Sequence, residues 1–451
     1  MLFSNLFSTK MFSLKQVFQY TSYFFIAVLL INLSAKVISL YIDFGFSTYW
    51  PFGIFHPRFP TIENILIAII TVAIFTVVIR NYSKILSRTS YLYGTIVLLI
   101  MLSNSVQGFE DGFKRPVSGR KNIQIQYYHD ALEIETASQF ISQFEDIQAD
   151  LRRHSQIHPP GALLFYYFAI QIGLSPWLIS VLILILSAGI TSFALRRILQ
   201  LTLPNEDVEF GVLLYFLIPS IQIYYLATLD AIIASFLLLT LSFYITENKF
   251  SNLISTIFAL SVALFLNFAS VFIFPVIFGY EFFRKKRLNK SIIILGGVIL
   301  IYLILYLTLG YNYINSMLIA SKIENPDGFS LLIEPIKYVF SRIESTLEPL
   351  IFFGPFLIIL FIRGLPVLKK NQPDIYLLSL LGIGSLFLMF LAGAYKIGES
   401  ARAAMFIYPY LLFPVIAYMN EFGKDVNERK QLLALIFAQT LFMQLSGSFF
   451  W

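Results

Sequence analysis

Long apolar runs alternate with short polar stretches along the whole chain. Most of these runs hold roughly 18 or more residues, enough for a helix to cross about 30 Å of hydrocarbon. Because a backbone in lipid must satisfy its own hydrogen bonds, each run is expected to be helical. By length, the pattern predicts about 13 spans. They cover residues 17–41, 64–79, 90–106, 161–173, 176–195, 210–226, 229–246, 252–282, 291–309, 347–363, 374–394, 403–419 and 432–449.

The composition is that of a membrane protein. Of the 451 residues, 57% are hydrophobic and 13% are charged. We therefore predict an all-α, polytopic helical bundle that forms a single transmembrane domain over residues 1–451. The basic residues behind the net charge of +6 sit in short loops, where they orient the spans, so we expect no nucleic-acid partner. Cysteine is absent, which excludes disulfides and thiolate chemistry.

Basic residues in short loops predict the orientation, because such loops stay on the cytoplasmic side. The basic clusters lie at Lys10 and Lys15, 80–88, 284–287, 363–370 and 424–430. Alternation of the spans then places residues 107–160, 310–346 and 395–402 on the extracytoplasmic side. The first apolar run, which follows Lys15, is predicted to be an uncleaved anchor. We expect a multi-pass protein of the inner or plasma membrane.

Arg196 and Arg197 do not fit strict alternation, which would put them outside. Two topologies remain open. In one, residues 161–195 make a single net crossing and the run 252–282 splits at Asn267. In the other, the two arginines lie on the outer side for a specific reason.

Residues 107–160 form an unusually polar segment, which we call the polar segment; it is predicted to be an extracytoplasmic loop. Its second half has the periodicity of an amphipathic helix, with apolar side chains from Ala137 to Leu151 on one face. Such a helix is too polar to span, and we expect it to lie in the membrane interface with its apolar face down. Residues 310–346 are predicted to be a second loop on the same side.

The stretch "YYHD" places Tyr128, His129 and Asp130 just before this amphipathic helix. Asp130 has two interpretations. It can cap the helix that follows, a role that suits aspartate. Alternatively, it can act as a general base at the membrane surface, where partial desolvation raises the pKa of a carboxyl group.

"HPPG" at 158–161 stands where the polar segment meets the next apolar run. Proline suits the first turn of a helix, because its missing N–H and fixed φ cost nothing there. His158 is then either a hydrogen-bonded interfacial histidine or part of a site. No metal ligand is assigned among the histidines, although a divalent cation remains open as a cofactor.

A second charged group, Lys396, Glu399 and Arg402, lies at the mouth of a predicted span in "YKIGESAR". Glu399 and Arg402 are three residues apart, so they share a helix face and can pair. The charges can simply extend to water from the membrane boundary. A charge at or inside that boundary is costly, however, and is usually functional.

Together these motifs resemble the GT-C superfamily of integral membrane glycosyltransferases, over residues 90–419. In members like protein O-mannosyltransferases and aminoarabinose transferases, an acidic pair precedes a His-Pro-Pro or Lys-Pro-Pro element by about the interval from Asp130 to His158. "GESAR" is similar to a Gly-Glu-x-x-Arg element of related bacterial members. The resemblance implies an inverting enzyme that uses a polyprenyl-phosphate sugar donor.

The resemblance also implies roles for the residues. "YYHD" holds one acid, so Asp130 is the predicted base, with Asp111 or Glu110 of "FEDGF" in reserve. Arg402 and Lys396 are predicted to bind the donor phosphate, supported by Glu399, His158, Tyr128 and His129. The acceptor is a lipid, a glycan or a protein. Two other functions remain open: a polysaccharide polymerase or ligase with a pyrophosphate-linked donor, and a transporter.

Overall fold

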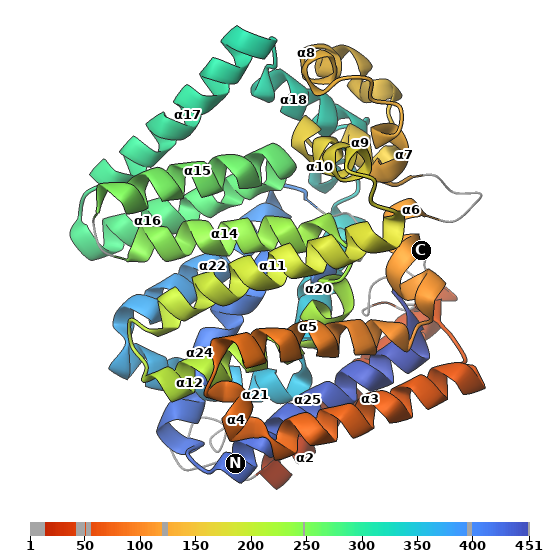
Figure 1. Cartoon of the computed structure of the whole chain (residues 1–451), viewed down its shortest axis with the longest axis vertical. Coiled ribbons are helices and arrows are strands. Elements are labelled where there is room, and N and C mark those ends of the chain that lie inside the picture. The colour runs from red at the N-terminus through yellow and green to blue at the C-terminus, as the bar shows by residue number, and fades with distance from the viewer. Residues whose placement is uncertain are drawn as a thin grey trace. The chain divides into compact units, whose positions relative to one another are not determined.

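The computed structural model of the chain describes residues 14–41, 50, 56–119, 125–246, 249–394 and 399–449. The regular structure in these residues is almost entirely helical (Figure 1). The described strands are β1 (His56–Pro57) and β2 (Gly447–Ser448), which pair antiparallel with His56 opposite Ser448. The prediction of an all-α protein is confirmed.

Five described helices are long and apolar enough to cross a membrane. A bent pair of helices is a sixth candidate. Their length and composition are typical of a membrane protein, while the larger predicted number of spans stays a prediction. The five helices cover Lys15–Ser39, Ile62–Arg80, Pro176–Leu199, Asn289–Leu309 and Pro373–Leu391.

Contacts between Cα atoms divide the described chain into two compact units. Unit 1 comprises the described residues of Met1–Val106, Leu199–Tyr224 and Glu334–Phe449. Unit 2 comprises those of Gln107–Ile198 and Tyr225–Ile333. The single transmembrane domain predicted over 1–451 stays a prediction.

In unit 1, α21 and α24 pack along each other. Gly364 permits their approach, because a Cβ atom at this position would lie 1.8 Å from the carbonyl oxygen of Pro414. Unit 1 contains α2 (Leu14–Ser39), α3 (Ile62–Arg80), α4 (Tyr82–Leu86), α5 (Thr89–Ser105), α12 (Asn205–Leu217), α13 (Pro219–Tyr224), α20 (Pro335–Phe353), α21 (Pro355–Asn371), α22 (Pro373–Leu391), α23 (Ser400–Ala403), the 3₁₀ turn Met405–Ile407, α24 (Tyr408–Phe422) and α25 (Val426–Ser446).

The predicted span 347–363 is not one helix. Helices α20 and α21 meet at Gly354 and are bent by 96° relative to each other. Gly354 has φ 109°, a conformation that glycine adopts without steric cost, and Pro355 then begins the next helix. The prediction was wrong here because the apolar run continues unchanged through the bend.

In unit 2, α14 lies beside α15, and α15 also contacts α17 (Figure 1). Unit 2 contains a π-helical turn (Glu110–Lys114), α6 (Arg115–Ser118), α7 (Tyr127–Ala131), α8 (Ala137–Ile147), a 3₁₀ turn (Gln148–Asp150), α9 (Arg153–Gln156), α10 (Pro160–Gln171), α11 (Pro176–Leu199, whose last residue belongs to unit 1), α14 (Leu229–Ile245), α15 (Phe250–Leu266), a 3₁₀ turn (Phe268–Phe272), α16 (Ile273–Lys285), α17 (Asn289–Leu309), α18 (Tyr313–Glu324) and α19 (Ser330–Ile333).

Three other predicted spans differ from the helices observed. The run 210–226 is interrupted at Ile218, between α12 and α13, and α24 begins at Tyr408 rather than at 403. The run 252–282 breaks at Asn267, whose side chain accepts a hydrogen bond from the N–H of Ala269 at 2.8 Å. One of the two open topologies requires this last break. How often residues 161–195 cross stays a prediction.

The amphipathic helix of the polar segment is present as α8, and Thr136 caps it. Its apolar side chains Phe140, Ile141 and Phe144 are buried by the protein itself, where α8 contacts α10, α17 and α18. The expectation that lipid covers this face is therefore corrected. The isolated sequence contains no sign of the partner helices, so an amphipathic face leaves the covering partner open.

Hydrogen bonds and an ion pair connect the polar segment to the part of the chain that follows α17. Glu145 accepts hydrogen bonds from the backbone N–H of Asn312 at 2.5 Å and from the Asn315 side chain at 2.6 Å. Arg153 forms an ion pair with Glu324 at 2.7 Å. The polar segment and the start of the second predicted loop therefore lie close together in unit 2, while their side of the membrane stays a prediction.

Candidate functional site

Asp130 is held from three directions. Its carboxylate pairs with the Arg152 guanidinium at 2.5 Å and accepts hydrogen bonds from the Arg152 backbone N–H at 3.2 Å and from the Ser155 hydroxyl. The side chain is 3% exposed. Asp130 does not cap α8, because Thr136 does so. Its geometry is that of an anchor between α7 and α9, and its role as a base stays a prediction.

Arg152 connects this anchor to the surface. A hydrogen bond to Glu133 raises the pKa of its guanidinium; burial lowers that pKa, and a further hydrogen bond to Asp130 raises it. The net direction is upward, so Arg152 remains a cation beside Asp130.

Glu110 and Asp111 each pair with a base four residues later, within the turns that follow α5. Glu110 lies 3.2 Å from Lys114, and Asp111 pairs with Arg115. The side chain of Asp111 is 30% exposed and that of Glu110 is 63% exposed. Both predicted reserve acids are therefore more accessible than Asp130.

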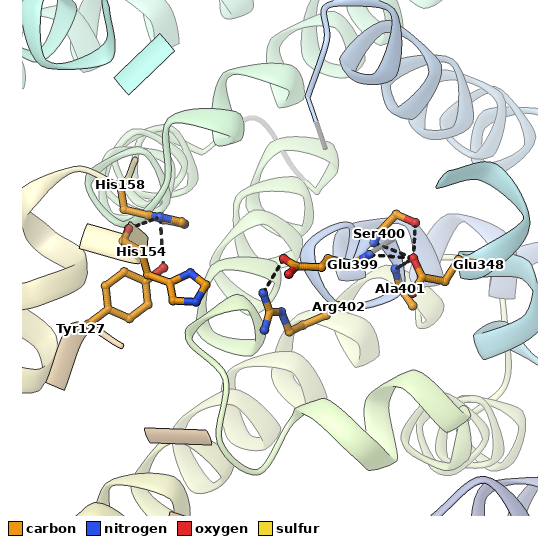
Figure 2. Close-up of polar contacts among 8 residues, drawn as sticks. All are labelled: Tyr127, His154, His158, Glu348, Glu399, Ser400, Ala401 and Arg402. Carbon is orange, nitrogen blue, oxygen red and sulfur yellow. Dashed lines mark hydrogen bonds and ion pairs between the residues drawn. The ribbon is translucent and has the colours of Figure 1, made fainter. Parts of the chain in front are cut away.

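His158 belongs to a small cluster with Tyr127 and His154 (Figure 2). Its Nδ1 lies 3.0 Å from the carbonyl oxygen of His154 and 3.1 Å from the Tyr127 hydroxyl. A carbonyl only accepts, so the bond to His154 requires a proton on Nδ1, and in the neutral ring Nε2 is then the acceptor. His158 is thus hydrogen-bonded just before Pro160, the first residue of α10.

The predicted supporting residues Tyr128 and His129 lie on α7, with ring centroids 5.8 Å apart. The Nε2 atom of His129 is 2.6 Å from the carbonyl oxygen of Ser118. Because a carbonyl only accepts, Nε2 carries the proton in this bond. His129 therefore connects α7 to the end of α6.

In unit 1, Arg402 and Glu399 form the predicted pair, with Nη2 and Oε2 2.8 Å apart (Figure 2). The Arg402 side chain is 18% exposed. Glu399 has φ 148°, a region that L-residues other than glycine rarely adopt. Residues 399–402 are called the arginine strap below. Lys396, the other predicted phosphate ligand, lies outside the described residues.

Glu348 of α20 holds the arginine strap, and the sequence patterns did not single it out. Its Oε2 accepts hydrogen bonds from the backbone N–H groups of Glu399, Ser400 and Ala401 at 2.9, 2.8 and 3.4 Å (Figure 2). The Ser400 hydroxyl also donates to it at 2.8 Å. Glu348 is 3% exposed. The sequence did contain one signal for Glu348, because an acidic residue inside a predicted membrane span is usually functional.

The strap is also held at its carbonyl side. The carbonyl oxygen of Ala401 accepts hydrogen bonds from the Ser220 hydroxyl at 2.7 Å and from the Tyr408 hydroxyl at 3.1 Å. Ser400 and Ala401 are fully buried. The backbone beside Arg402 is thus fixed by several partners, which is the condition under which a strained conformation persists.

Helix α20 also binds the chain just before the strap. Arg342 donates to the carbonyl oxygens of Phe390 and Ala394, and the Tyr338 hydroxyl donates to Phe390 at 2.8 Å. These carbonyls lie at or just after the end of α22, where a cation is favourable. Helix α20 therefore holds both the end of α22 and the arginine strap.

The predicted site residues gather into two groups, one in each unit. Unit 2 holds Asp130, His158 and the other residues of the polar segment, and unit 1 holds Glu399 and Arg402. Among the described residues, no three His, Asp or Glu side chains are arranged to hold a metal ion. No protein-family model matches the chain, and no curated protein has a significantly similar sequence.

Proposed function

We propose that this protein is an inverting membrane glycosyltransferase of the GT-C type, with about 13 spans by the length criterion. It transfers a sugar from a polyprenyl-phosphate donor to a lipid, glycan or protein acceptor on the extracytoplasmic side. The observation that carries the proposal is the arginine strap. A partly buried guanidinium is held at the end of a fixed, strained turn by an acid that orients it.

Arg402 fits a departing phosphate. Its planar group offers parallel donors that match two phosphate oxygens, and a partly dehydrated setting strengthens such bonds. In the reaction, an acceptor hydroxyl oxygen forms a bond to the anomeric carbon while the bond from that carbon to the phosphate oxygen breaks. The phosphate leaves with the bonding electrons, and Arg402 stabilises the charge that develops on it.

A carboxylate of the polar segment takes the proton of the acceptor hydroxyl. Asp130 was the first choice from sequence, but its carboxylate already accepts from Arg152 and Ser155 and is nearly inaccessible. We therefore give the role of base to Asp111, with Glu110 beside it in reserve. Asp130 then holds the segment in shape.

The test is a transfer assay with the purified protein in nanodiscs, using a panel of polyprenyl-phosphate and polyprenyl-pyrophosphate sugars. We expect transfer from a phosphate-linked donor, with inversion at the anomeric carbon, and loss of turnover in Asp111→Asn. Transfer only from pyrophosphate-linked donors would assign a polymerase or ligase instead. Uptake of solute into liposomes without transfer would assign a transporter.

The side of the membrane is tested separately. The chain contains no cysteine, so single cysteines give clean labelling. Ser138 is exposed on α8, and Ser83 is exposed in the basic loop that is predicted to be cytoplasmic. We expect an impermeant thiol reagent to label Ser138→Cys in intact cells and Ser83→Cys only after permeabilisation. The reverse pattern would rule out an extracytoplasmic site.

A further inference from the structure

Glu348 makes a concentrated set of hydrogen bonds. A single oxygen, Oε2, accepts from three consecutive backbone N–H groups and one hydroxyl of residues 399–401. Hydrogen bonds to an ionised acceptor are about twice as strong as neutral ones. This acid belongs to α20 and lies 52 residues before Ser400 in the chain. Glu348 therefore ties the start of α23 to another helix.

The strap cannot hold its own shape. Helix α23 has four residues, and so short a helix is not stable by itself. It also follows Glu399, whose positive φ costs energy in any residue other than glycine. The conformation that presents Arg402 must therefore be imposed by partners. Glu348 accepts three hydrogen bonds from this backbone, whereas Ser220 and Tyr408 each donate one to it.

We propose that Glu348 is a positioning residue for Arg402, and this inference rests on the proposed function in that Arg402 binds the donor phosphate. Glu348 acts in two ways. It fixes the backbone from which Arg402 extends. It also occupies the backbone N–H groups of the strap, which would otherwise attract an anion, so the phosphate is directed to the guanidinium and not to the amides.

The chain offers a matched control in Glu281 of α16. Glu281 is also buried, and it accepts hydrogen bonds from the backbone N–H of Ser291 at 2.7 Å, from the Ser291 hydroxyl at 2.7 Å and from the Lys290 N–H at 3.1 Å. Glu281→Gln therefore makes the same side-chain change in the same kind of anchor. Glu281 lies in unit 2, whereas the arginine strap lies in unit 1.

The experiment compares Glu348→Gln, the milder Ser400→Ala and Glu281→Gln in nanodiscs. Hydrogen exchange of the peptide containing residues 399–403 reports on the strap, and binding of a short-chain polyprenyl phosphate reports on Arg402. We expect Glu348→Gln to speed exchange there about tenfold and to weaken phosphate binding about tenfold, since a charged hydrogen bond is lost. Ser400→Ala should show a smaller change in the same direction.

Glu281→Gln should leave both measurements at the wild-type level while lowering the melting temperature as Glu348→Gln does. Wild-type exchange and binding in a folded Glu348→Gln protein would overturn the inference. If Glu348→Gln does not fold, the same two measurements are made on Ser400→Ala, and wild-type exchange and binding in that variant would overturn the inference. If the wild type binds no polyprenyl phosphate, the proposed function fails, and exchange alone decides whether Glu348 holds the strap.

Discussion

Two buried glutamates, Glu281 in unit 2 and Glu348 in unit 1, make nearly the same contacts with different consequences. Each carboxylate accepts from consecutive backbone N–H groups at the start of a helix and from the hydroxyl of a serine in that helix. Ser291 and Ser400 are the two serines. In both places a buried acid satisfies amides that have no partner within the helix.

The helices they hold differ. Helix α17 has 21 residues, and the residue before it, Leu288, has φ −132°, a relaxed conformation. Helix α23 has four residues, follows the strained Glu399 and ends beside Arg402. The same anchor therefore lies at the start of a long, regular helix in one region, and imposes a conformation on a short, strained segment in the other. The strained Glu399, and not the buried acid by itself, distinguishes the Glu348 anchor from the Glu281 anchor.

The largest expected effect is on turnover, and it comes from changing the cation beside each glutamate: Arg402 in unit 1 and Lys290 in unit 2. Arg402→Lys keeps the charge but loses the planar fork, so we expect turnover to fall about 100-fold without loss of folding. Lys290→Arg is the matched change beside Glu281 and should leave turnover unchanged. The transfer assay at equal protein level measures both. Normal turnover in Arg402→Lys would remove Arg402 from the site.

Asp130 extends the comparison, because it also accepts from a backbone N–H and a serine hydroxyl. If it is an anchor like Glu281, Asp130→Asn should lower the free energy of unfolding by about 2 kcal/mol and leave turnover per folded molecule nearly unchanged. Denaturant unfolding and the transfer assay measure the two quantities. If Asp130→Asn instead loses turnover while its stability is unchanged, Asp130 is the base.

Backbone strain at Glu399 predicts a smaller effect, on stability. A glycine substitution should have opposite effects on stability at Glu399 and at Leu288. Glu399→Gly relieves the positive φ, so stability should stay level or rise by about 1 kcal/mol, while turnover falls because Arg402 loses its partner. Leu288→Gly, at the relaxed position before α17, should cost about 1 kcal/mol. Thermal unfolding compares them. Equal destabilisation by both glycines would contradict the assignment of strain.

The smallest expected effect is at Ser291. Ser291→Ala removes one of the three hydrogen bonds to Glu281 and should cost about 1 kcal/mol of stability. Turnover and hydrogen exchange in the arginine strap should not change. A clear change in either would mean that the Glu281 anchor also serves the site, and the distinction between the two regions would disappear.

The apolar pattern predicted the class of the protein well and its helix breaks poorly. Helices such as α3, α17 and α22 match the predicted runs, because lipid demands long apolar helices. The bend at Gly354 and the breaks at Ile218 and Asn267 leave hydrophobicity almost unchanged, so a hydrophobic run does not reveal them. Pro160 was the exception, because it begins α10 as expected of a proline in the first helical turn.

What the sequence determined by itself is local. Residue spacing gives α8 its apolar face, which follows from the helical repeat. It also places Arg402 three residues after Glu399, close enough to pair, although Glu399 itself lies before the helix. The tertiary structure decided the rest. It buried Asp130 against Arg152, covered α8 with protein and brought Glu348 to Ser400 across 52 positions. Contacts between distant segments depend on how helices pack, and no local pattern of residue types encodes that packing.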